Sequence, residues 1–200
     1  METSERQRQI LTAASACFTR FGFHGASMQQ ICAEAGMSAG ALYRHYPSKA
    51  AIIVAIAEAE RAQHALMFEG LDTSPEPLET LREIGTAFLR RQLEGTDELL
   101  TADVVAEAGR NPEIRVAFER NAALVHETLC RTLLRGQGLG VVDPGLDVPA
   151  ACTLLIALGD GLCSAHAGVP GMTVDRLADA MGLLLKRFCS PLAGPGGGAV

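Results

Sequence analysis

Long stretches of this sequence are rich in residues that favour helices, and short groups of capping residues separate them. Alanine, leucine, glutamate, arginine and glutamine fill these stretches, whereas tryptophan is absent and aromatic residues make up only 4% of the chain. Strands favour aromatic and β-branched side chains, so a sheet is not expected. Because 48% of the 200 residues are hydrophobic, the chain can bury a substantial core. The sequence therefore predicts an all-α globular protein.

The capping residues predict about nine helices, four of them in the first third of the chain. They are expected near residues 3–21, 28–35, 39–46, 49–67, 77–94, 97–108, 112–135, 148–167 and 174–189. A linker at 72–77 follows the fourth helix. Residues 191–200 contain three consecutive glycines and are predicted to form a flexible tail.

The second and third predicted helices are separated by a tight turn, Gly36-Met37-Ser38. Ser27-Met-Gln-Gln30 is a capping box, in which the Ser27 hydroxyl accepts from the Gln30 amide and the Gln30 side chain reaches back. Gly36 suits a left-handed helix end, and Ser38 is an expected N-cap. Two short helices joined in this way form a helix-turn-helix, whose second helix enters the major groove of DNA. An ordinary helical corner is the alternative.

Charge is distributed unevenly along the chain. The formal net charge of the whole chain is -6, but residues 1–50 carry five basic and three acidic side chains, a net charge of +2. The remaining residues carry 12 basic and 20 acidic side chains, a net charge of -8. A basic region on an acidic body fits contact with a polyanion at one end of the molecule. An ordinary solvated face is the alternative explanation for so small an excess.

A longer pattern surrounds the turn. It comprises Ile10-Leu-x-Ala-Ala-x-x-Cys-Phe18, Phe21-Gly-Phe-x-Gly-Ala-Ser-Met28, Ile31-Cys-x-x-Ala-Gly-Met-Ser38, Gly40-x-Leu-Tyr-x-His-Tyr46 and Ser48-Lys49. Over about residues 6–53 this pattern resembles the DNA-binding region of the TetR family of transcriptional regulators. The resemblance implies an all-helical homodimer in which residues 1–50 bind a palindromic operator. It also implies that residues 51–190 dimerise and bind a small effector, with the helix at 49–67 connecting the two parts.

The predicted recognition helix at 39–46 supplies the candidates for reading bases. Arg44 is its only long donor, so it suits bidentate hydrogen bonds to O6 and N7 of guanine. Ala39 and Ala41 can contact thymine methyl groups, and Gly40 lets the backbone approach the DNA closely. Tyr43, His45 and Lys49 match positions of the family that contact phosphate. Further candidates for contacts with phosphate or an adjacent groove are Gln29, Ser38, Arg6 and Arg8.

A ligand pocket is expected among the central helices, where polar side chains interrupt apolar stretches. Acidic groups beside an apolar cavity would favour a cationic or hydrogen-bonding ligand. The candidate lining residues are Met67, Phe88, Gln92, Leu100, Asp103, Val104, Glu107, Phe118, His126 and Leu155. Ordinary core packing is the alternative role for the apolar members of this set.

The segment at 148–167 is apolar almost all around its circumference, as expected of a helix covered by its own domain and by a partner subunit. Together with the last helix it predicts the seam of a homodimer. The candidate interface residues are Ala157, Gly161, Leu177, Met181, Leu184 and Phe188. A monomeric core is the alternative.

Other classes of function find little support in the sequence. The pair Cys163-x-x-His166 lacks the further ligands that zinc requires, and the glycine-rich run in the C-terminal tail is not a phosphate-binding loop. An enzyme, a metal site and a cofactor are therefore not expected. The start of the chain lacks the apolar core of a secretion signal, and Asp160 and His166 interrupt the most apolar stretch, so we expect a cytoplasmic protein without a membrane span.

The six cysteines are scattered without a CxxC motif, and most are expected to be small buried hydrophobic residues. A regulator that senses redox state or metal through Cys130, Cys152 or Cys163 is the alternative on the same scaffold. The main hypothesis is a repressor. An apolar or cationic organic effector would release it from DNA by widening the separation of the two DNA-binding regions.

Overall fold

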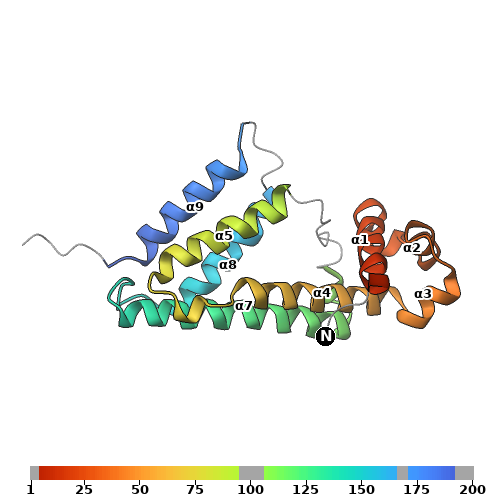
Figure 1. The fold of residues 1–200 in the computed structure, drawn as a ribbon, viewed down its shortest axis with the longest axis horizontal. Helices are drawn as coiled ribbons and strands as arrows, with labels where there is room; N and C mark the ends of the chain where they lie inside the picture. Colours follow the sequence, from red (N-terminus) through yellow and green to blue (C-terminus); the bar gives the residue numbers. More distant parts are fainter. Residues whose placement is uncertain (1–4, 95–105, 166–170, 192–200) are drawn as a thin grey trace, which may run out of the picture. The chain divides into compact units, whose positions relative to one another are not determined.

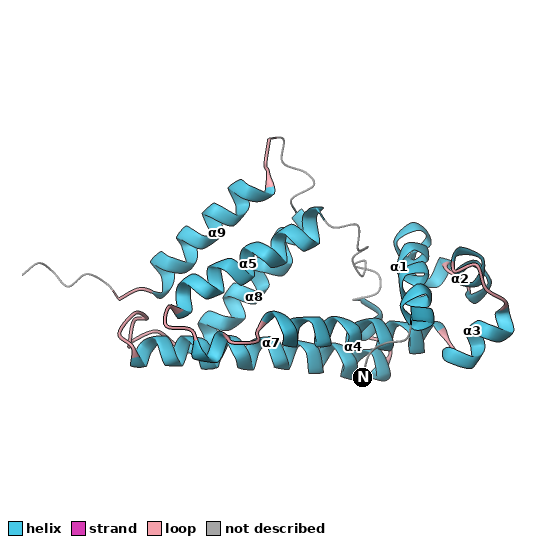
Figure 2. Ribbon diagram, in the orientation of Figure 1, coloured by secondary structure: helices cyan, strands magenta, loops and turns pink. Residues whose placement is uncertain are grey.

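The computed structural model describes residues 5–94, 106–165 and 171–191, and these contain helices and connecting turns but no strand (Figure 2). The predicted all-α fold is confirmed. Eight α-helices and one 3-10 helix have described bounds: α1 (Glu5–Gly25), α2 (Met28–Glu34), α3 (Ala39–His45), α4 (Lys49–Met67), η1 (Leu71–Thr73), α5 (Pro77–Glu94), α7 (Pro112–Gly138), α8 (Val148–Ala165) and α9 (Val174–Cys189). Residues 106–108 are also helical.

The described residues form two compact units. The first, here called the head unit, comprises residues 5–64 and 106–124. The second, the body unit, comprises residues 65–94, 125–165 and 171–191. Both α4 and α7 begin in the head unit and end in the body unit (Figure 1). The predicted division at residue 50 therefore differs from the division by contacts, since α4 packs with the head as far as residue 64.

The first helix continues past the predicted end at Gly22. Gly22 has a left-handed φ of 69° with a ψ of 168°, which bends the chain, and helical structure resumes as far as Gly25. Only glycine adopts this conformation without strain. The bend places Phe23 in the core, where its ring centroid lies 5.9 Å from that of Phe18.

The helix-turn-helix forms as its capping residues predict. Ser27 Oγ accepts from the Gln30 amide at 3.2 Å, and the Ser27 amide donates to Gln30 Oε1 at 2.8 Å. Gly36 has a φ of 60°, which ends α2. Ser38 Oγ accepts from the Ala41 amide at 3.3 Å and caps α3. These local bonds confirm the predicted capping box, left-handed glycine and N-cap.

A single apolar cluster holds the head unit together. Ile31, Leu42 and Tyr46 pack with Phe18 in this cluster, as the sequence predicts. Its fully buried larger side chains, which come from α1 to α4 and α7, are Ile10, Phe18, Ile31, Leu42, Ile52, Ile53 and Ile114. Burial of each such side chain stabilises the fold by about 1.5–3 kcal/mol. The positions of α2 and α3 are therefore set by the same core that holds the start of α4.

In the body unit, α5 lies alongside α9 (Figure 1). A Cβ atom at Gly182 would lie 2.8 Å from the Arg82 stem, so glycine permits this close approach. Arg90 and Asp175 join the same two helices through an ion pair of 2.8 Å. A second cluster, which includes Leu71, Leu133 and other buried residues of α5, α8 and α9, forms the main core of this unit. Within the described part of the chain, no helix is long and apolar enough to cross a membrane.

Candidate nucleic-acid interface

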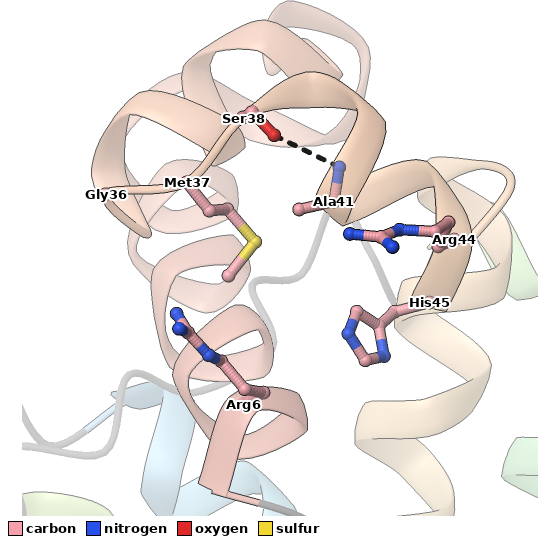
Figure 3. Close-up of a pocket in the computed structure, with 7 residues that line it drawn as sticks. All are labelled: Arg6, Gly36, Met37, Ser38, Ala41, Arg44 and His45. Carbon is pink, nitrogen blue, oxygen red and sulfur yellow. Dashed lines mark hydrogen bonds between the residues drawn. The ribbon is translucent and has the colours of Figure 1, made fainter.

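A hollow of about 330 Å³ lies beside the turn of the helix-turn-helix. Figure 3 shows Arg6 on the first turn of α1 at one side, and Arg44 and His45 on α3 at the other. Gly36, Met37, Ser38 and Ala41 complete the lining, which contains no carboxylate. Two guanidinium groups and an imidazole around one hollow favour an anionic partner such as a phosphate group.

The register of α3 separates its structural face from its outer face. Leu42 and Tyr46 point into the head core, and burial raises the pKa of the Tyr46 hydroxyl above its usual value. Tyr43 between them is 51% exposed, and Arg44 is also exposed. Because side chains three or four residues apart share a helix face, the inward anchors leave the intervening residues directed outward. The outer face of α3 is thus available to a groove of DNA.

Every predicted DNA-contact residue except Lys49 is exposed. The exposed members are Arg6, Arg8, Gln29, Ser38, Ala39, Gly40, Tyr43, Arg44 and His45. The structure brings four of them, Arg6, Ser38, Arg44 and His45, to one hollow. Met37 and Ala41 also line this hollow. Ala41 is a predicted contact to thymine methyl groups, whereas Met37 is not among the predicted contact residues.

Lys49 has partners inside the protein. Its Nζ atom donates to the carbonyl oxygens of Phe23 at 2.5 Å and Ala26 at 2.6 Å, and lies 3.5 Å from that of His24. The ammonium also lies 4.6 Å from the centroid of the Phe23 ring. A cation at a helix C-terminus satisfies carbonyls that have no partner within the helix. Lys49 therefore caps α1 and attaches it to the first turn of α4.

Two family profiles match the chain. The profile described as "Bacterial regulatory proteins, tetR family" matches residues 10–56, and that described as "BetI-type transcriptional repressor, C-terminal" matches residues 77–190. The chain belongs to the TetR family of transcriptional regulators. This TetR-family chain is thus a DNA-binding transcriptional regulator rather than an enzyme, as the sequence predicts.

Individual relatives agree with this assignment. The HTH-type transcriptional repressor Rv1474c of Mycobacterium tuberculosis is 32% identical over 189 residues, which cover 90% of each chain. The structure of Salmonella enterica GusR matches with a TM-score of 0.74 and 26% identity, over 94% of this chain and 95% of that one. A transcriptional regulator from Saccharomonospora viridis, solved in complex with choline, matches with a TM-score of 0.69 and 28% identity, over 95% and 100% of the two chains.

Glu107 of this TetR-family chain, a predicted member of the ligand pocket, lies in the head unit. Its side chain is almost buried, with 8% of its surface exposed, and its Oε2 atom lies 3.2 Å from His24 Nε2 and 3.7 Å from Arg110. The pKa of Lys49 is lowered by burial, and the charge of Glu107 opposes this effect. Glu107 therefore joins the segment before α7 to the end of α1. No local sequence signal marks this contact, because its partners are distant along the chain.

The other predicted pocket residues lie in different places. Phe118 packs against the head core beside Ile114. The remaining described members, Met67, Phe88, Gln92, His126 and Leu155, lie in the body unit and are half-buried. Leu100, Asp103 and Val104 lie outside the described residues.

The predicted dimer residues divide into two groups. Leu177 and Met181 pack inward against Leu89 within the body unit. By contrast, Ala157 and Gly161 on α8 and Leu184 and Phe188 on α9 are exposed. Two larger exposed side chains on the same helices were not predicted, namely Leu154 at 61% and Leu183 at 51% exposure. The signal for Leu154 was the continuous apolar character of α8, and the signal for Leu183 was the run of three leucines at 183–185 in α9.

The cysteines with described side chains are all free thiols. Cys17, Cys32, Cys152 and Cys189 are buried, whereas Cys130 is partly exposed. The side chain of Cys163 lies outside the described part of the structure. Among the described residues, no three histidine, cysteine or acidic side chains are arranged to hold a metal ion.

Proposed function

We propose that this chain is a homodimeric repressor that binds a palindromic operator through α3 of its two head units. A small organic effector bound by the body unit releases it from DNA. The observation that carries this proposal is the exposed outer face of α3 beside the acid-free hollow formed by Arg6, Arg44 and His45. A helix-turn-helix whose second helix has an exposed outer face binds DNA by placing that helix in the major groove.

Within this interface Arg44 reads a guanine, and the neighbouring groups contact the DNA backbone. The backbone contacts come from Tyr43, His45, Lys49, Ser38, Gln29, Arg6 and Arg8. Lys49 can still contact a phosphate because its hydrogen bond to the His24 carbonyl is long, at 3.5 Å. One N–H of the ammonium can turn from this oxygen to a phosphate while the other two continue to cap α1. Ala39 and Gly40 face the bases, where small side chains allow close approach.

The direct test is selection of DNA fragments by the purified protein, followed by measurement of affinity for the selected operator. Arg44→Ala should cost about 1–3 kcal/mol and relax the preference at one base pair in each half-site. Arg115→Ala is the matched control, because Arg115 is an exposed arginine of the head unit on α7. An unchanged sequence preference in the Arg44→Ala protein would exclude Arg44 as the base-reading residue.

Salt dependence separates backbone contacts from base contacts. The logarithm of operator affinity should fall steeply with the logarithm of salt concentration, by about 0.9 for each neutralised phosphate. Lys49→Ala should weaken binding to all sequences alike and make this slope shallower. A slope that stays the same would mean that Lys49 acts only as the cap of α1.

The exposed apolar faces of α8 and α9 support the proposed dimer. Leu184 is 44% exposed, and it adjoins Ala180, Leu183, Arg187 and Phe188 in a shallow surface hollow. A contiguous apolar surface of this kind is characteristic of an interaction site. An isologous contact between two such surfaces forms a twofold-symmetric dimer, which matches a palindromic operator. The two half-sites should then lie about 34–36 Å apart.

A cationic effector is supported by the similar structure from Saccharomonospora viridis, which was solved in complex with choline. Phe88 of the body unit is half-buried, and aromatic rings attract quaternary ammonium groups. Since α4 is continuous from the head unit to the body unit, it can transmit a displacement that widens the separation of the heads.

Choline is therefore the first probe for calorimetric titration with and without operator DNA. Linkage requires that operator and effector weaken each other by the same factor, with a coupling of about 1–3 kcal/mol. Equal choline affinity in both titrations would exclude choline as the inducing ligand.

The second candidate function is a sensor of redox state or metal on the same scaffold. The described residues offer no metal-binding group, so the metal form of this candidate has no support in them. The redox form is favoured by the placement of Cys130 and Cys152 at the same core of the body unit, where Cys130 is partly exposed.

A further inference from the structure

The arginines of the head unit differ in their partners. Those that form ion pairs with glutamate side chains, at distances of 2.9 to 3.8 Å, are Arg20, Arg61, Arg110, Arg115 and Arg120. By contrast, Arg6 and Arg44 line the hollow beside the helix-turn-helix, where no carboxylate is present. Within the described residues neither of them has an acidic partner. The guanidinium groups at this hollow therefore keep their donors for a partner from outside the chain.

His45 belongs to the same hollow. Figure 3 shows its ring on α3 and the guanidinium group of Arg6 on α1 directed into one space, with Arg44 next to the ring. The charged groups that line the hollow with the imidazole are thus Arg6 and Arg44, and the turn between α2 and α3 contributes no charged group to the lining. The ring of the neighbouring Tyr46 lies 6.5 Å from that of His45, centroid to centroid. A bound anion would therefore bring a negative charge to a ring that has only cations around its hollow.

The rest of the lining suits a phosphate group. Ser38 Oγ accepts from the Ala41 amide, so its hydroxyl proton is left to donate into the hollow. Met37 and Ala41 add apolar surface that does not compete for the charged donors. A phosphodiester group offers only acceptor oxygens and a negative charge, and guanidinium and imidazolium groups bind such oxygens through short, charge-assisted hydrogen bonds. The volume of about 330 Å³ is enough for one such group together with bridging water.

We propose that Arg6 and His45 bind the same phosphate of the operator backbone, and that His45 takes up a proton when it binds. This inference rests on the proposed operator binding and adds its regulation by pH. A neutral imidazole donates one hydrogen bond, whereas an imidazolium donates from both nitrogens and carries the charge that pairs with phosphate. Because the phosphate favours the charged ring, linkage requires that protonation of the ring strengthen DNA binding by the same factor. The proton comes from solvent, and no covalent bond to the DNA forms or breaks.

Operator affinity should therefore fall as the pH rises. Histidine is the side chain whose charge changes between about pH 5 and pH 8. The guanidinium groups of Arg6 and Arg44 stay charged throughout this range, and so does the phosphodiester. Each of the two heads of the dimer takes up its own proton. We expect the affinity of the dimer to fall about tenfold or more between about pH 6 and pH 8.

The test measures the affinity of the full-length protein for its selected operator by fluorescence anisotropy, at several pH values and constant ionic strength. Calorimetric titration in buffers of different ionisation enthalpy then counts the protons taken up, and we expect a net uptake of up to one for each head. Equal affinity across the pH range, or no proton uptake, would overturn the inference and leave the proposed operator binding intact. A protein that selects no DNA fragment would refute the proposed function, and this inference with it.

Variants assign the proton to His45. His45→Gln keeps a donor but cannot gain a charge, so it should lose most of the pH dependence and bind several-fold more weakly than the wild type at low pH. His45→Arg carries a fixed charge, and its affinity should not fall between the two ends of the range. His24→Gln is the matched control, because His24 is a histidine of the same unit that pairs with Glu107 and does not line the hollow. This control should keep the wild-type pH dependence, and a His45→Gln protein that also keeps it would overturn the inference.

A double-mutant cycle tests whether Arg6 and His45 share one phosphate. Substitutions of groups that contact the same partner have effects that do not add as free energies. The loss of affinity in the protein with both Arg6→Gln and His45→Gln should differ from the product of the two separate losses by about threefold or more. The same cycle with Arg8→Gln is the control, since Arg8 is an exposed arginine of α1 that does not line the hollow, and its loss should multiply with that of His45→Gln. Losses that multiply for Arg6 as well would show separate phosphates and overturn the shared contact.

Discussion

Replacement of Gly40 by alanine should change stability and DNA binding in opposite directions. Gly40 is exposed in the first turn of α3, and a Cβ atom placed there would meet nothing within 4 Å. Its φ is not in the left-handed region, so alanine can adopt the same backbone conformation. Alanine is favoured over glycine within a helix by about 0.5–1 kcal/mol. The melting temperature of the free protein should therefore rise by about 1–4 °C.

The same methyl group would lie on the face of α3 that is proposed to meet the bases. It would push the recognition helix away from the groove in both heads of the dimer, so base contacts would lengthen on both sides. We expect operator affinity to fall about tenfold or more, which corresponds to at least about 1.4 kcal/mol. A more stable protein that binds DNA less well cannot be explained by damage to the fold.

Thermal unfolding followed by circular dichroism gives the stability, and fluorescence anisotropy with labelled operator gives the affinity. Gly138→Ala is the matched control, because Gly138 ends α7 in the body unit and a Cβ there also meets nothing within 4 Å. This control should leave operator affinity unchanged. Wild-type affinity in the Gly40→Ala protein would refute close approach of α3 to DNA, and a loss of stability would refute the open space around Gly40.

Three further outcomes test other parts of the structure. Lys49→Met should lower the free energy of unfolding by about 1–3 kcal/mol, because carbonyls in the last turn of α1 lose a charged donor. Urea unfolding measures this, with Lys186→Met as the control. Lys186 is exposed, so its replacement should lower the free energy of unfolding by less than about 0.5 kcal/mol. Equal decreases in the two variants would contradict the role of Lys49 as a cap. The Leu184→Arg protein should sediment as a monomer. The control protein, Leu139→Arg, carries its substitution at an exposed position after α7 and should stay dimeric. A dimeric Leu184→Arg protein would exclude the proposed seam. Burial raises the pKa of Cys189 from its ordinary 9.0 to about 11, so the folded state retains a proton that the unfolded state loses. The contribution of Cys189 to the free energy of unfolding should therefore be complete below about pH 9 and fall as the pH rises towards 11 under reducing conditions. A Cys189→Ala protein whose urea midpoint depends on pH in the same way as that of the wild type would contradict this.

The helix-turn-helix could be predicted in detail from the sequence. Its boundaries depend on Ser27, Gln30, Gly36 and Ser38, and each of these acts on backbone groups within about four residues of itself. Such contacts are nearly the same in any protein that contains the motif, because chain geometry already holds the partners close together. The same reasoning predicted the bounds of α4, α5 and α9.

Glycines beyond these motifs were harder to interpret. Gly22 was predicted to end the first helix, but it bends the chain and lets Phe23 join the head core. Likewise α7 continues for three residues past its predicted end, to Gly138. A Cβ atom at Gly136 would lie 2.5 Å from Val142, so this glycine serves a close approach of the following loop. A glycine can end a helix, bend it or allow another segment to approach it closely. Which of these occurs depends on neighbours that the local sequence does not reveal.

The sequence by itself determined the helices, the turn between α2 and α3, and the outward face of the recognition helix. These features follow from caps and from helical periodicity, which act over a few residues. Only the tertiary structure decided that Lys49 caps α1, that Glu107 meets His24, and that Cys130 packs against the core that contains Cys152. The partners in these pairs are far apart along the chain, and packing of the two cores brings them together. Since packing depends on the shapes of many side chains at once, no short sequence pattern encodes it.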